Sequence, residues 1–246
     1  MIETRGRKDL IEQGQIRVML ALDFLADELY TNRQILKEVT GITSSQGIGG
    51  FIKRLEKLGF AREINLPSVE EPNKTYKIIG INSQGMAEVN YIDRRGFEIS
   101  KLKHSQLLHK FLCQQIHLQA VKQNHKYISG RWLTDEWFGG KNIKRPDAII
   151  ITQDNQKIAI EAERTIKSKY RYQQIIVQYL KIIKTGQISK VRYVMPDQAK
   201  AQMVEKAIKS IKSVTVSTNG QKRLFNLTDE VWKCLNLKLS NKRSKL

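Results

Sequence analysis

Two apolar segments joined by a short polar turn constrain the fold of this chain more than any other part of its sequence. Residues Ala148–Thr152 are mostly apolar and β-branched, Gln153–Gln156 are polar, and Lys157–Ala162 are again mostly apolar. Segments of this length and composition favour β-strands, and the polar residues between them favour a turn. The sequence therefore predicts an antiparallel hairpin centred near Asp154.

Carboxylate side chains lie at matching distances on either side of this centre. Asp147 is seven residues before Asp154 and Glu161 is seven after it, so pairing places the two carboxylates opposite each other, roughly 5 Å apart. Glu163, two residues further on, points to the same face of the strand. Clustered carboxylates repel one another, and a divalent cation such as Mg²⁺ offsets that cost with an all-oxygen site. We therefore expect these three acids to bind Mg²⁺ or Mn²⁺.

The net charge of the chain points to a polyanionic partner. The formal charge is +19, and residues 1–95 hold 14 Lys and Arg against 13 Asp and Glu, whereas the remaining 151 residues hold 29 against 11. No acid occurs in 164–196, directly after the hairpin, although this stretch contains eight Lys and Arg. Because neutralising phosphates releases counterions, this excess of positive charge favours nucleic-acid binding by the C-terminal part of the chain.

An acidic metal pocket beside a basic surface is the arrangement that metal-assisted phosphodiester cleavage requires. The cation activates water and neutralises charge on the phosphate, while basic side chains hold the nucleic-acid strand. Aromatic side chains in such a surface can stack on bases. We expect the DNA contacts around the hairpin to come from Arg145, Arg164, Lys169, Arg171, Tyr172 and Gln173.

At these residues the chain resembles a known nuclease superfamily. Pro146-Asp147 followed by Glu161-Ala162-Glu163 resembles the PD-(D/E)xK signature, and the expected order of helices and strands agrees with that core. The string Ile-Glu-Ala-Glu-Arg-Thr-Ile-Lys-Ser-Lys, after an N-terminal DNA-binding module, resembles the MobC-type relaxases of mobilizable plasmids and the broader replication-relaxation group. The resemblance implies an enzyme that nicks one DNA strand at a plasmid transfer origin, together with an auxiliary mobilization or coupling protein.

The chain departs from this signature at one position. Glu163 stands where the motif normally has lysine, and the resemblance implies that a lysine of the following helix takes over its role. Lys167 is favoured over Lys169, because it lies four residues after Glu163. The resemblance also implies that Glu136 contributes a further metal ligand. A tyrosine nucleophile, Tyr170 or Tyr172, remains an alternative.

The first 95 residues have the pattern of a winged helix-turn-helix. Helical periodicity over 16–29 is followed by a short helix at 33–39, a Gly41 turn and a third helix that ends near Gly59. Two strands, 61–64 and 75–79, then enclose a polar loop that would form the wing. Such a module would contact DNA through Ser44, Ser45, Gln46, Lys53 and Arg54 of the third helix and Lys74 of the wing. A purely protein-binding role for the module remains an alternative.

The sequence thus predicts a mixed α/β (α+β) chain of two domains, 1–95 and 96–246, with a restriction-endonuclease-like core of a mixed sheet flanked by helices in the second. A helix from Ser100 to Lys122 would open that domain, and its histidines show no tight metal-chelating spacing. Cys113 and Cys234 are expected to be reduced thiols. Because no basic segment followed by an apolar run opens the chain and no apolar run is long enough for a membrane helix, we expect a cytoplasmic protein.

Two other functions share these features. A non-catalytic DNA-binding regulator or replication initiator would use the nuclease-like domain as a scaffold, which the missing lysine at position 163 favours. A restriction-type endonuclease would use the same chemistry to cut both strands. The relaxase is the favoured interpretation.

Overall fold

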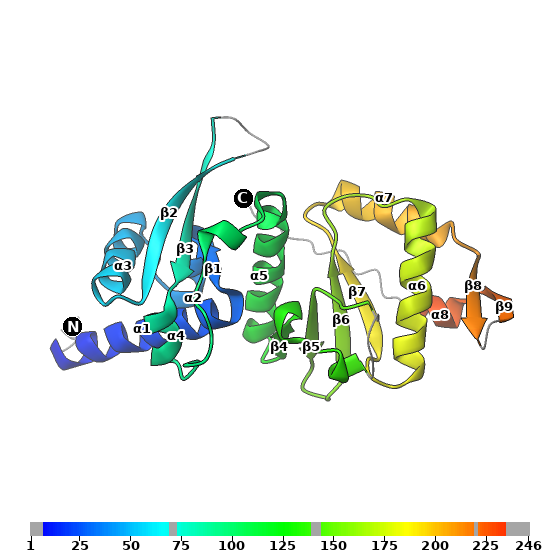
Figure 1. Cartoon of the computed structure of the whole chain (residues 1–246), viewed down its shortest axis with the longest axis horizontal. Helices are drawn as coiled ribbons and strands as arrows, with labels where there is room; N and C mark the ends of the chain where they lie inside the picture. The colour runs from blue at the N-terminus through cyan, green and yellow to red at the C-terminus, as the bar shows by residue number, and fades with distance from the viewer. Residues whose placement is uncertain (1–6, 69–72, 139–143, 219–220, 235–246) are drawn as a thin grey trace, which may run out of the picture. The chain divides into compact units, whose positions relative to one another are not determined.

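Apolar side chains from the two halves of the chain pack into separate cores, so the chain divides into two units, Met1–Leu118 and Gln119–Leu246. The computed structural model describes residues 7–68, 73–138, 144–218 and 221–234. Helices and strands are mixed in both units (Figure 1), which confirms the α/β class. None of the described helices is long and apolar enough to cross a membrane.

The first unit combines helices with one small antiparallel sheet. Its strands lie in the order β1-β3-β2. The elements are α1 (Arg7–Glu28), β1 (Tyr30–Asn32), α2 (Arg33–Thr40), α3 (Ser45–Lys57), β2 (Ala61–Pro67), β3 (Thr75–Ile81), α4 (Ser83–Glu88), two 3-10 turns, η1 (Ile99–Lys101) and η2 (His104–Gln106), and α5 (Leu107–Lys122).

Local sequence signals account for most of these boundaries. Asn32 and Ser44 cap α2 and α3, each accepting a hydrogen bond from a backbone amide three residues on. Gly41 ends α2 in the left-handed region at φ 67°, where a residue without Cβ carries no steric penalty. The predicted helices and wing strands are present, although β2 extends to Pro67 and the short β1 was not predicted.

The boundary between the units lies later than the sequence suggested. Phe97, Leu107, Phe111 and Leu118 pack in one core with residues of α1, α2 and β3, so residues 96–118 belong with the first unit. The long helix also begins at Leu107, because 99–106 form the two 3-10 turns.

Buried polar contacts attach α5 to the rest of this unit. Glu28, at the end of α1, has a fully buried side chain and binds His117 Nδ1 at 3.0 Å and Lys110 Nζ at 2.5 Å. Burial by itself raises the pKa of Glu28, but the hydrogen bond from His117 and the charge of Lys110 outweigh it, so the pKa is lowered. Gln114 of the same helix accepts a hydrogen bond from the Thr31 hydroxyl at 2.8 Å. These contacts hold a helix that apolar packing alone would orient less precisely.

The second unit is built on a four-stranded mixed sheet in the order β4-β5-β6-β7. The β4–β5 and β5–β6 pairs are antiparallel, and the β6–β7 pair is parallel. The elements are β4 (Lys126–Ser129), η3 (Gly130–Trp132), η4 (Glu136–Phe138), β5 (Ala148–Ile151), β6 (Lys157–Ala162), α6 (Lys169–Lys184), β7 (Lys190–Val194), α7 (Gln198–Lys209), β8 (Ser213–Thr218), β9 (Gln221–Asn226) and α8 (Asp229–Cys234).

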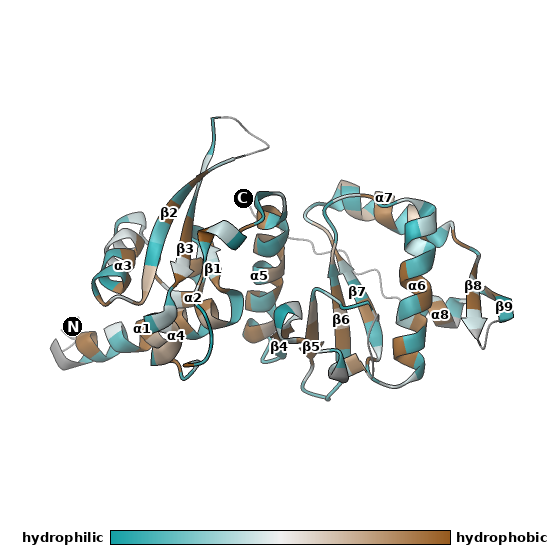
Figure 2. Ribbon diagram, viewed as in Figure 1, coloured by the Kyte–Doolittle hydropathy of each residue, from teal (hydrophilic) through white to brown (hydrophobic). Residues whose placement is uncertain are grey.

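One face of this sheet carries the core of the second unit. Ile149, Ala159, Val191 and Tyr193 of the strands pack with the apolar side of α6 and with α7. In Figure 2 the strands β5 and β6 are mostly brown, whereas α6 and α7 carry both brown and teal residues. A helix that joins two parallel strands must cover a face of the sheet, and α6 does so between β6 and β7 (Figure 1).

Candidate functional site

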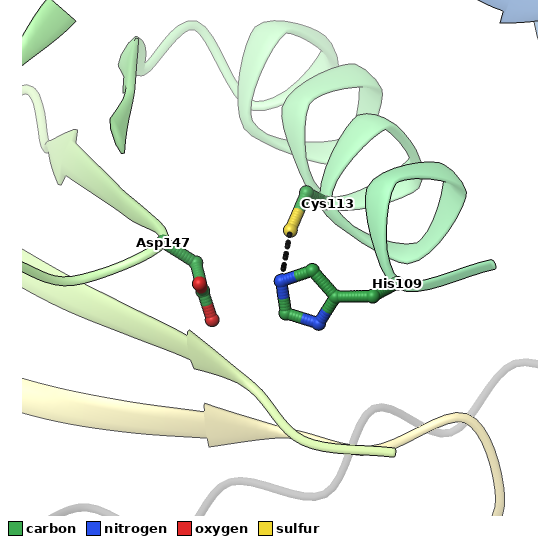
Figure 3. Close-up of side chains that lie close together, drawn as sticks. All are labelled: His109, Cys113 and Asp147. Carbon is green, nitrogen blue, oxygen red and sulfur yellow. Dashed lines mark hydrogen bonds between the residues drawn. The ribbon is translucent and has the colours of Figure 1, made fainter. Parts of the chain in front are cut away.

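The register of the β5–β6 hairpin places Asp147 beside Glu161. Ala148 pairs with Ile160 and Ile151 with Lys157, so the hairpin is centred on Asp154, as predicted. The Asp147 amide extends the pairing by donating to the Ile160 carbonyl at 2.9 Å. Asp147 Oδ2 accepts a hydrogen bond from the Ala162 amide at 2.8 Å, and Figure 3 shows this side chain where the chain enters β5.

Glu161 lies in the interior of the second unit. It is 4% exposed, and its Oε1 accepts hydrogen bonds from Lys144 Nζ at 2.6 Å and from the Tyr179 hydroxyl of α6. Burial raises the pKa of Glu161, and the nearby charge of Asp147 adds to that rise against the opposing effect of Lys144. A carboxylate in this environment gains from any additional positive charge that can reach it.

Glu163 follows the end of β6 and is equally buried. Its amide donates to the Val194 carbonyl at 2.8 Å, continuing the ladder between β6 and β7, and the residue is 4% exposed. Its Oε2 forms an ion pair with Lys167, the lysine favoured in the sequence. The backbone amide of Lys167 in turn donates to the Tyr172 hydroxyl at 3.2 Å.

Lys144 is a site residue that sequence reasoning missed. It lies outside any helix or strand, and only the tertiary fold brings its ammonium group to Glu161, 17 residues later. Its neighbour Arg145 forms an ion pair with Asp135 at 2.5 Å on the surface, and its expected contact with DNA stays a prediction. The place of Lys144 two residues before Pro146 was the one signal in the sequence, and no periodic pattern supported it.

The expected role of Tyr172 in DNA stacking is wrong. Its side chain is 0% exposed within the core of the second unit, because it lies on the apolar face of α6, so its ring cannot reach a base. Gln173 is partly buried and donates to the Ser213 carbonyl at 3.4 Å. The Glu136 side chain lies outside the described residues.

Basic side chains surround the start of α6. Lys169 and Arg171 are exposed in its first turn and Arg164 is partly buried before it. Ser168 caps this helix by accepting a hydrogen bond from the Arg171 amide at 3.3 Å. The amides of a helix N-terminus and nearby cations together favour anionic groups. Of the residues predicted to bind DNA in the second unit, these three and the exposed Arg145 remain accessible for that role.

A cleft of about 440 Å³ lies along α3 in the first unit. Ser45, Gln46 and Lys53 line it, and a Cβ built on Gly49 or Gly50 would meet no atom within 4 Å. The Arg33 guanidinium and the Glu63 carboxylate form a paired contact at 2.5 Å in its wall. Three of the residues predicted on the recognition helix thus share one open surface.

The other predicted contacts of the first unit are held by neighbours. Ser44 is the N-cap of α3, since its hydroxyl accepts the Gly47 amide at 2.9 Å. Arg54 lies against α1, where a Cβ added to Gly14 would approach its Nη1 to 2.6 Å. Lys74 lies over the Tyr76 ring at 5.4 Å. Each of these three side chains therefore already contacts another part of the first unit when no DNA is bound.

One histidine and one cysteine of α5 lie close together. His109 Nε2 and Cys113 Sγ are 3.7 Å apart on successive turns of α5 (Figure 3). Both cysteines are free thiols, as predicted.

The chain matches no family model, and neither the curated proteins nor the solved structures contain a significant match to it.

Proposed function

We propose that the chain is a metal-dependent DNA endonuclease that nicks one strand at a plasmid transfer origin, in the manner of a mobilization relaxase. The observation that carries the proposal is the hairpin register, which sets Asp147, just before β5, opposite Glu161 of β6. Glu163 follows two residues later, and both glutamates are only 4% exposed. This acidic site belongs to a unit that holds 26 Lys and Arg against 10 Asp and Glu. Such a charge favours a polyanionic substrate.

The folds of the two units support the same function. Three helices followed by an antiparallel hairpin, with a three-stranded sheet in the order β1-β3-β2, support the proposal of a winged helix. In the second unit an acidic hairpin, a crossover helix and a parallel strand follow one another, as expected for a PD-(D/E)xK core. The first unit would then select the site and the second would cleave it.

The acids offer a donor set that suits Mg²⁺ or Mn²⁺. All three are carboxylates, and neither Glu161 Oε2 nor Glu163 Oε1 has a hydrogen bond among the described residues. Hard divalent cations prefer oxygen ligands of this kind. When bound, the cation would supply Lewis-acid activation of water and of the scissile phosphate.

The residues of the chain then have distinct roles. Asp147, Glu161 and Glu163 hold the cation. Lys144 and Lys167, which neutralise two of these acids in the protein alone, become available to a phosphate oxygen once the cation takes over that neutralisation. Lys169 and Arg171 bind the strand at the start of α6.

Nicking of supercoiled DNA tests the proposal. The substrate is supercoiled DNA that carries the sequence flanking the gene for this protein, and it is incubated with the protein and Mn²⁺. We expect open circles with the wild type and none with Asp147→Ala. Asp154→Asn is the matched control, because Asp154 is an exposed acid in the turn of the same hairpin and should leave nicking unchanged. Equal nicking by wild type and Asp147→Ala would reject the proposal, and linear product would indicate a restriction-type enzyme.

A non-catalytic DNA-binding regulator or replication initiator is the second candidate. It is favoured by the two lysines that neutralise Glu161 and Glu163 without a cation. This function predicts DNA binding that does not depend on metal and survives Glu161→Ala. Calorimetry that detected tight Mn²⁺ binding, lost in Glu161→Ala, would count against it.

A further inference from the structure

Tyr193 of β7 has a buried hydroxyl without a partner. The residue is 1% exposed, and its hydroxyl makes no hydrogen bond within the described part of the chain. In the parallel pairing of β6 and β7, Tyr193 is the register partner of Glu161. Its side chain packs in the core on the face that α6 covers, which is the face where Tyr179 reaches Glu161. Tyr193 therefore lies next to Glu161 in the sheet, on the same face.

The charges of both buried glutamates act on the same hydroxyl. Burial raises the pKa of Tyr193 well above its ordinary value, and the negative charges of Glu161 and Glu163 raise it further. A phenol O–H is a hydrogen-bond donor.

The neighbouring tyrosines do not share this condition. The Tyr179 hydroxyl donates to Glu161 Oε1, and the Tyr172 hydroxyl accepts the Lys167 amide. A buried hydroxyl that lacks a partner lowers stability, so its retention in a site of this kind calls for a ligand that is absent from the protein alone. The three hydroxyls can therefore be compared directly, because only that of Tyr193 lacks a partner within the described residues.

We propose that the Tyr193 hydroxyl donates a hydrogen bond to an oxygen atom in the coordination shell of a divalent cation held by Asp147, Glu161 and Glu163. The inference rests on the proposed function, since it assumes the same cation. Tyr193 is then a positioning residue. It orients an oxygen ligand, as groups that support the direct ligands of a metal commonly do.

The test compares Tyr193→Phe with Tyr179→Phe in the full-length protein. Mn²⁺ affinity is measured by calorimetry, and thermal unfolding is followed in EDTA and in Mn²⁺. We expect Tyr193→Phe to bind Mn²⁺ about tenfold more weakly, the lower end of the effect of removing a supporting group. In EDTA its melting temperature should equal or exceed that of the wild type, because the variant removes an unpaired buried hydroxyl. Tyr179→Phe should lose stability in EDTA, because its hydroxyl is paired.

The outcomes separate this inference from the proposed function. If the wild type binds Mn²⁺ and nicks DNA but Tyr193→Phe binds Mn²⁺ equally well, the role of Tyr193 is rejected and the nuclease remains. If Tyr193→Phe loses as much stability in EDTA as Tyr179→Phe, its hydroxyl already has a partner, such as a buried water, and the inference fails. If the wild type binds no Mn²⁺, the proposed function fails together with the inference.

Discussion

At the scale of single residues, the main feature is the burial of acids whose charge the protein only partly compensates. One carboxylate oxygen of Glu161 accepts hydrogen bonds from Lys144 and Tyr179. The pKa of Glu161 is still raised, because the effect of burial on the ionised form is larger than the effect of these contacts. An acid with a raised pKa in the folded state supports stability at low pH and loses that support as the pH rises through the folded value. Its retention is easier to explain by binding than by folding.

Glu161→Gln should therefore stabilise the cation-free protein at alkaline pH. The free energy of unfolding in EDTA should exceed that of the wild type at pH 8, and the difference should shrink as the pH falls toward the ordinary glutamate value of 4.5. Urea unfolding at several pH values measures this. Asp154→Asn is the control, and its effect on stability should have the opposite sign. The pKa of Asp154 is lowered, and the main cause is its hydrogen bond with Thr152. A Glu161→Gln variant less stable than the wild type at pH 8 contradicts the prediction.

The two lysines of the site should be separable by substitution. Lys144→Ala and Lys167→Ala should each reduce the nicking rate about 10²-fold, the scale of losing one charged contact to the reacting phosphate. Lys184→Ala is the control, since Lys184 is exposed in the last turn of α6 and should have little effect. Single-turnover nicking assays measure all three. If only one of the two substitutions slows nicking, that lysine alone takes the role of the motif lysine, which Glu163 replaces in this chain.

Tyr193 and Lys144 show what residue patterns alone do not reveal. Tyr193 is 32 positions from Glu161 in the chain, and only the parallel β6–β7 register brings them together. Lys144 reaches Glu161 from a segment without regular structure. The three acids could be predicted because one hairpin contains them and its geometry is local. Contacts that depend on side-chain burial or on long-range pairing follow from packing, which a single sequence does not specify.

At the scale of elements, strong periodicity made most helices and the central hairpin predictable. The missed strands are short or lack alternation. The strand β4 spans four residues, and every residue of β9 is exposed, so neither carries the pattern of a half-buried strand. The extent of α5 was misjudged because Ser100–Gln106 have helical composition but form 3-10 turns.

The attachment of α5 to α1 is testable through Glu28. Glu28→Gln should lower the free energy of unfolding by about 3 kcal/mol, because removing one partner leaves buried positive charge uncompensated. The lowered pKa of Glu28 also means that its contribution is present above the ordinary value of 4.5 and is lost as the pH falls below it. Urea unfolding at pH 7 and pH 4 measures both effects. Glu98→Gln, at an exposed ion pair with Lys101, should leave stability unchanged. Equal effects of the two substitutions would show that burial of Glu28 is unimportant.

At the scale of the whole molecule, positive charge is distributed unequally. The first unit holds 17 Lys and Arg against 14 Asp and Glu, and the second holds 26 against 10. Affinity for a polyanion should therefore come mainly from the second unit. The first unit, with its α3 cleft, would contribute choice of sequence more than strength of binding.

The salt dependence of DNA binding tests this division. Replacing Lys169 and Arg171 by alanine should reduce the slope of log K against log salt by about 2, since each phosphate contact contributes about 0.9. The paired control replaces Lys206 and Lys209, both exposed on α7, with the same change in net charge. Fluorescence anisotropy with a labelled duplex at several salt concentrations gives the slopes. Equal slopes for both double variants would show that the start of α6 makes no particular phosphate contact.

The turn at the far end of the β5–β6 hairpin has a consequence for how such a protein can change through evolution. Pairing centred on Asp154 puts Asp147 and Glu161 on one face of the sheet. One inserted or deleted residue between the strands would slip the register and turn one carboxylate to the opposite face. Selection for the acids therefore also acts on loop length, many residues away from them. The number of residues in this turn is therefore constrained by the two carboxylates at the other end of the hairpin.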